Sequence, residues 1–132
     1  MTVYQIGHIL ACMKGRKERK PLVWLHGEVK TPPFSQAARL EAGLLLARLQ
    51  EGDALAMPVS RPLPALGSRC HELRINDGAM NWRIIYRLEP DAVLILEVFL
   101  KKTQRAPAAV LKVCRSRMRQ YDRICGASHE ER

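Results

Sequence analysis

Several arginines of this sequence recur at alternate positions in two neighbouring segments. Arg74 follows Glu72 by two residues, and Arg83 and Arg87 flank the apolar Ile85 by two residues on either side. Side chains of a β-strand alternate between the two faces of a sheet, so this spacing groups the three arginines on one face. A guanidinium binds phosphate through two parallel hydrogen bonds and keeps its charge near neutral pH. The pattern indicates a phosphate-binding face, although a solvated face with ion pairs from Glu72 would have the same spacing.

Two further groups of cations extend this pattern. Lys101 and Lys102 follow Phe99-Leu100 at the end of a third apolar segment, which places them at the edge of the same sheet. The expected C-terminal helix carries four more cations away from its apolar stripe, namely Lys112, Arg115, Arg119 and Arg123. Such a row is either a solvated helix face or a contact for RNA.

The overall charge favours a polyanionic partner. The chain has 22 Lys and Arg against 13 Asp and Glu, a formal charge of +9. A small domain of this charge attracts nucleic acid or the ribosome, and the alternative is a basic protein that is merely soluble. The length of 132 residues fits one domain, and the hydrophobic content of 47% is typical of a globular one.

The cysteines and histidines give no metal-binding pattern. The four cysteines lie too far apart for a zinc site and are Cys12, Cys70, Cys114 and Cys125. We expect them to be reduced structural thiols of a cytoplasmic protein. His71 shares a strand face with Leu73, which is compatible with packing and with catalysis, whereas His26 is expected to be structural or exposed.

The first 20 residues differ from the rest of the chain. The stretch before Met13 is mostly apolar, and five cations follow within residues 14–20. A secretory signal has the opposite order, and the apolar stretch is too short to span a bilayer, so no membrane association is expected. Residues 1–20 are predicted to be an extension, either an amphipathic arm or sequence upstream of a functional start at Met13. The patterned domain then occupies residues 21–123, and a polar tail occupies 124–132.

The patterned domain begins with a strand and a helix. A short strand is expected over 21–26, and a helix over 34–50 with Thr31 as its N-cap. Residues 53–68 contain three prolines and Gly67, which predicts a connection without a long regular element.

A meander of three strands and a second helix complete the prediction. The strands are expected over 70–75, 82–88 and 92–100, and the helix over 107–123. In the middle strand Trp82, Ile84, Tyr86 and Leu88 share the core face, so Trp82, like Trp24, fits a core better than a base-stacking surface. The predicted fold class is α+β, a small antiparallel β-sheet with helices packed on one face. The arginines would then lie on the uncovered face.

Short motifs follow one another through these elements. They are Val23-Trp24, Leu49-Gln50-Glu51-Gly52, Pro62-Leu63-Pro64-Ala65-Leu66-Gly67, Glu72-Leu73-Arg74, Trp82-Arg83-Ile84-Ile85-Tyr86, Phe99-Leu100-Lys101-Lys102-Thr103-Gln104, and Pro107 before an Ala-rich and Arg-rich helix. Their order and spacing, over about residues 21–121, resemble the RelE/ParE toxin superfamily. Within it, these motifs resemble the phage-derived HigB branch.

The resemblance implies a toxin of a type II toxin–antitoxin system, an mRNA interferase that cuts mRNA in the ribosomal A site and so inhibits translation. Ribonucleases of this kind use the 2′-hydroxyl of the RNA as nucleophile and need no metal or other cofactor. Glu72 or His71 could then act as base and Lys102 as proton donor. By position in the motifs, the cations facing the substrate are Arg74, Arg83, Lys101 and Lys102. Further RNA contacts are expected from Arg87, Arg115 and Arg119.

The chain departs from the RelE pattern at one point. RelE-type members place a tyrosine shortly after the basic pair, and residues 103–109 contain none. This departure supports one alternative on the same fold, a non-catalytic nucleic-acid-binding or phage-associated protein. A second alternative that stays open is a ParE-like gyrase inhibitor. The resemblance also implies a cognate antitoxin, with a helix-turn-helix domain, that binds and neutralises this chain.

Overall fold

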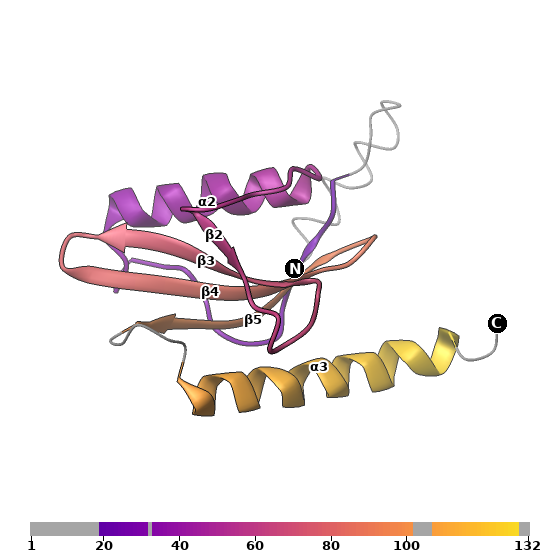
Figure 1. The fold of residues 1–132 in the computed structure, drawn as a ribbon. Helices are drawn as coiled ribbons and strands as arrows, with labels where there is room; N and C mark the ends of the chain where they lie inside the picture. Colours follow the sequence, from indigo (N-terminus) through magenta and orange to yellow (C-terminus); the bar gives the residue numbers. More distant parts are fainter. Residues whose placement is uncertain (1–18, 32, 102–106, 130–132) are drawn as a thin grey trace.

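The structure is a computed structural model, which describes residues 19–31, 33–101 and 107–129 (Figure 1). The predicted extension therefore lies almost entirely outside the described residues, as does Lys102. The elements follow the order β1 (Leu22–Trp24), α2 (Gln36–Gln50), β2 (Ser60–Pro62), β3 (Cys70–Asp77), β4 (Met80–Leu88), β5 (Val93–Leu100) and α3 (Ala108–His129). No helix in these described ranges is both long and apolar enough to cross a membrane.

The sheet has five strands in the order β1-β5-β4-β3-β2. Strands β2 to β5 pair antiparallel, as the short connections between the last three predict. Strand β1 is parallel to β5, with Leu22 opposite Val93. The α+β prediction is confirmed, but the sheet is mixed and not purely antiparallel. The cause is the placement of β1, which pairs with the distant β5 and not with its neighbour in sequence.

The first core layer lies between the sheet and α2. Leu45, Leu49 and neighbouring residues of α2 pack on Leu73, Ile84 and Tyr86, all of them buried. The ring of Trp82 stacks on Phe34 with centroids 4.2 Å apart, which confirms its core position. The alternation predicted for β4 is therefore correct.

The second core layer lies on the opposite face, under α3. Cys114 and Met118 of α3 pack on Ile85 and Leu94 of the sheet. Figure 1 shows α2 and α3 on opposite sides of the strands. The prediction that both helices cover one face is thus wrong. The physical reason is that Val93, Leu94 and their two successors in β5 are all buried, so both faces of this strand need an apolar cover.

Element boundaries shift by a few residues from the predicted ones. Helix α2 begins at Gln36, because the Ser35 hydroxyl, and not Thr31, accepts the hydrogen bond from the Ala38 N–H at 3.0 Å. The connection over 53–68 contains the short edge strand β2. Helix α3 continues to His129 through most of the predicted polar tail.

Candidate nucleic-acid interface

The predicted phosphate-binding residues meet on the α3 side of the sheet. Arg74 of β3 pairs with Arg83 of β4, so their side chains leave the same face. Glu72 of β3 pairs with Arg61 of β2 on that face. Lys101 follows β5, and its backbone N–H bonds to the Asn81 carbonyl. We call these five residues, Arg61, Glu72, Arg74, Arg83 and Lys101, the Glu72 cluster.

Glu72 is the centre of this cluster and is 1% exposed. One carboxylate oxygen lies 3.7 Å from Arg83 Nε and 3.7 Å from Lys101 Nζ. Both distances exceed those of a good hydrogen bond, and neither oxygen has a hydrogen-bond partner among the described residues. A buried carboxylate with empty acceptor sites is costly, so the nearby cations must offset much of the cost.

Arg83 and Lys101 are themselves buried, at 5% and 8% exposure. Burial lowers the pKa of both groups, and the Glu72 charge opposes this by favouring their charged forms. The positive charge of Arg74 also lowers the pKa of both groups, and the charge of Arg61 lowers the pKa of Lys101. Two cations therefore pair with one carboxylate and two more lie on the same face, which leaves an excess of positive charge at this site.

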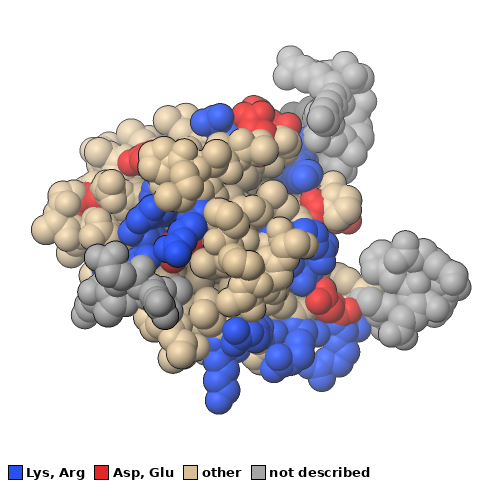
Figure 2. All heavy atoms as spheres, in the orientation of Figure 1, with Lys and Arg blue, Asp and Glu red and all other residues tan. Residues whose placement is uncertain are grey.

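Positive charge also predominates on the surface near this site. Figure 2 shows basic side chains gathered at the sheet edge between the two helices, and a second row of them along α3. Arg83 Nη1 donates to the Trp82 carbonyl at 2.9 Å, which fixes its guanidinium near the carboxylate. The Arg83 Nε, by contrast, has no hydrogen-bond partner in the part of the chain that the structure describes.

His71 lies on the other face of β3 from Glu72. Its ring stacks on Tyr86 with centroids 5.3 Å apart, on the side covered by α2. The structure therefore does not bring it together with the cluster, and of the two predicted bases only Glu72 belongs to the site. His26 is exposed and bonds to Glu97 at 2.8 Å, as expected of a structural or surface residue.

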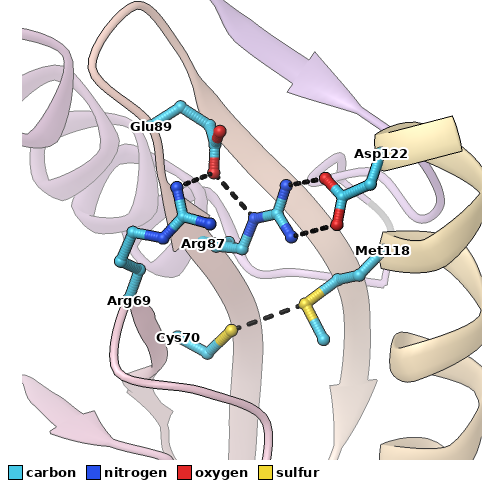
Figure 3. A network of polar contacts seen from close by, with 6 residues as sticks. All are labelled: Arg69, Cys70, Arg87, Glu89, Met118 and Asp122. Carbon is cyan, nitrogen blue, oxygen red and sulfur yellow. Dashed lines mark hydrogen bonds and ion pairs between the residues drawn. The ribbon is translucent and has the colours of Figure 1, made fainter. Parts of the chain in front are cut away.

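Arg87 shares the face of the cluster but is held in a separate network (Figure 3). Its guanidinium donates to both oxygens of Asp122 at 3.1 and 2.6 Å, and to Glu89 at 2.7 Å. The hydrogen bond from Arg87 lowers the pKa of Asp122. With 5% exposure and two carboxylate partners, Arg87 ties α3 to the sheet, and we leave it out of the candidate interface.

The other two predicted RNA contacts, Arg115 and Arg119, are exposed on α3. They line a hollow with Arg69 and Arg87, separate from the Glu72 cluster. Arg61 and Arg69 were not predicted as site residues. Arg61 lies in a proline-rich connection, where only the pairing of β2 with β3 reveals that it faces Glu72.

The site offers acid–base and electrostatic chemistry. No group of three or more potential metal ligands occurs among the described residues. A buried carboxylate can accept a proton from a hydroxyl, and fixed guanidinium and ammonium groups can stabilise the charge of a phosphate in a transition state.

Comparison with known proteins agrees with this arrangement. The model of the family "Phage derived protein Gp49-like (DUF891)" matches residues 33–119, more than half of the chain and all of the Glu72 cluster. This is a toxin-like family related to RelE and HigB. A search of curated proteins found no significant match. The chain therefore belongs to the phage-derived Gp49-like protein family.

Proposed function

We propose that this protein is the toxin of a type II toxin–antitoxin system, a HigB-type endoribonuclease that cuts mRNA at the ribosome. The observation that carries the proposal is the Glu72 carboxylate, buried, without a hydrogen-bond donor in the described chain and 3.7 Å from two cations. A buried polar group left unsatisfied calls for an explanation, and an RNA hydroxyl would supply the missing donor once the side chains that cover the carboxylate move aside.

The proposed reaction is a transesterification within the RNA. Glu72 accepts the proton of the 2′-hydroxyl, and the 2′-oxygen forms a bond to the adjacent phosphorus. The bond from phosphorus to the 5′-oxygen breaks, and a lysine, Lys101 or Lys102, donates a proton to that oxygen. The products are a 2′,3′-cyclic phosphate and a 5′-hydroxyl, with no redox change.

The cations serve the transition state. Arg83 and Arg74 lie opposite each other on β4 and β3, so their guanidiniums can stabilise the extra charge on the phosphate oxygens. Because Arg83 and Lys101 are largely desolvated, each interaction with phosphate is stronger than it would be in water. The positive excess around one carboxylate supports binding of a polyanion over binding of a cation.

We further propose that a cognate antitoxin, with a helix-turn-helix domain, binds and neutralises this chain. The test is co-expression: the protein made alone should arrest growth, and the protein made with the antitoxin should not.

The cleavage itself is tested by mapping mRNA 5′ ends after brief induction of the wild type, Arg83→Ala, Lys102→Ala and the control Arg39→Ala. Arg39 lies exposed on α2, on the far side of the sheet. We expect codon-phased cuts in translated messages from the wild type and from Arg39→Ala, and loss of these cuts in Arg83→Ala and Lys102→Ala.

Two other results would contradict the proposal. Growth arrest without new 5′ ends would point to another target, such as DNA gyrase. Folded, soluble protein that causes neither arrest nor cleavage would indicate a binding protein without catalytic activity.

A further inference from the structure

The outer face of α3 carries a row of cations that the Glu72 cluster does not include. Its members follow one another at intervals of three, four and four residues, which places them on one side of a helix. They are Lys112, Arg115, Arg119 and Arg123, and we call them the α3 row. Figure 2 shows basic side chains along the lower edge of the molecule, where α3 lies in Figure 1.

The carboxylates of Asp122 and Glu89 are bound by arginines outside the α3 row. Asp122 is the only acidic residue of α3, and both its oxygens accept hydrogen bonds from Arg87. Glu89 accepts from Arg87 at 2.7 Å and from Arg69 at 3.0 Å. Figure 3 shows this closed set of pairs between the sheet and the helix. The network therefore removes the local acids from competition for the row.

The α3 row itself has no carboxylate partner among the described residues. Arg115 makes one long contact, with the Ala65 carbonyl at 3.5 Å, and no ion pair. An isolated solvated helix face normally intersperses acids with its bases, since like charges at such spacings repel. A row of one sign, whose only acidic neighbour on the helix has both carboxylate oxygens bound by Arg87, is better suited to an anionic partner than to water alone.

A hollow lies beside the α3 row and is lined in part by Arg115 and Arg119. It has a volume of about 360 Å³ and lies between α3 and the residues that precede β3. Its polar lining comes from Arg69, Arg115 and Arg119, with Ser68 and the Arg87–Asp122 pair. A phosphate group could therefore meet two or three guanidiniums there at once.

We propose that the α3 row and this hollow form a second RNA-binding surface, which holds the phosphate backbone of an RNA strand apart from the cleavage site. From Lys112 to Arg123 the helix rises roughly 16 Å, a length over which an RNA strand presents several phosphates. The inference rests on the proposed function for the choice of RNA over other polyanions. The row acts in docking and makes no contact with the reacting atoms.

The experiment measures binding of a 20-nucleotide RNA with 2′-O-methyl groups, which the proposed reaction does not cut, by fluorescence anisotropy from 50 to 200 mM salt. The test variant carries Arg115→Gln, Arg119→Gln and Arg123→Gln. A matched control loses the same number of charges elsewhere, through Lys30→Gln, Arg39→Gln and Arg48→Gln. Each lost phosphate contact with single-stranded RNA lowers the salt slope by about 0.7. The test variant should therefore lose about 2 from its slope and at least roughly ten-fold in affinity at 100 mM salt, and the control less than half of that.

Three results would overturn the inference. One is an unchanged slope in the α3 variant, and a second is an equal loss in the control, which would show an effect of net charge alone. The third is intact RNA binding with lost antitoxin binding, which would assign the surface to a protein partner. A wild type that binds RNA through α3 but never cleaves it would sustain the inference while refuting the proposed function.

Discussion

The ion pair between Arg87 and Asp122 should be one of the main links between α3 and the sheet. The Arg87 side chain is 6% exposed, whereas that of Asp122 is 57% exposed. Breaking a buried pair costs about 3–5 kcal/mol, and exposed pairs are worth about 0.2–1 kcal/mol. Because one partner is buried and the other is half in water, we expect a coupling energy of about 2 kcal/mol.

A double-mutant cycle measures this coupling. Arg87→Ala, Asp122→Ala and the double variant would be unfolded in urea, with tryptophan fluorescence as the signal. The pair of Arg48 and Asp53, at 3.2 Å with both side chains about half exposed, provides a matched control. Its coupling energy should be below about 0.5 kcal/mol.

The coupling should also depend on pH. Arg87 lowers the pKa of Asp122 in the folded protein below its ordinary value. The stabilisation is therefore complete above the unfolded pKa of about 3.9 and is lost as the pH falls through the lower folded value. Equal coupling energies for the buried and the control pair at pH 7, or coupling that does not decrease as the pH is lowered below about 3.9, would refute this reasoning.

Two further predictions concern other parts of the fold. Ser35→Ala removes the N-cap of α2 and should lower the free energy of unfolding by about 1 kcal/mol, measured in urea; a loss below about 0.3 kcal/mol would mean that the cap contributes little. Burial raises the pKa of Cys114 from 9.0 to about 12, so at pH 8 its thiolate should be about 1000-fold scarcer than in the unfolded chain. Mass spectrometry after iodoacetamide treatment should find Cys114 labelled only in denaturant, and rapid labelling of the native protein would show that α3 does not stay packed on the sheet.

Local patterns in the sequence were sufficient for most of the fold. The alternation in β4 predicted that Trp82, Ile84 and Tyr86 face a core, because burial on one face imposes a period of two. The placement of α3 was missed, although the uninterrupted apolar run at the start of β5 is typical of a strand covered on both faces. The parallel pairing of β1 with β5 depends on residues about 70 positions apart, which no local pattern encodes.

The candidate site was predictable in its composition but not in its burial. The sequence spacing placed Arg74 and Arg83 on the same face of the sheet, because side chains alternate between the two faces along each strand. The face on which a cation lies does not show whether a carboxylate is paired with it. Arg87 lies on the same face as Arg83. Its guanidinium, however, donates hydrogen bonds to Asp122, 35 residues away, and this pairing removes Arg87 from the interface. The burial of the Glu72 carboxylate beside Arg83 and Lys101 likewise depends on the pairing of β3, β4 and β5.

The role of Glu72 as the base is tested by comparing Glu72→Gln with the wild type on ribosomes programmed with a defined mRNA. The substitution keeps the size of the side chain but removes the base, and circular dichroism would confirm that the variant is folded. Loss of a general base costs about 10²–10⁴ in rate. We expect a 2′,3′-cyclic phosphate product from the wild type, a rate at least about 100-fold lower for Glu72→Gln, and no cleavage where the 2′-hydroxyl at the cut site is replaced by hydrogen. Cleavage by folded Glu72→Gln at the wild-type rate would contradict this role.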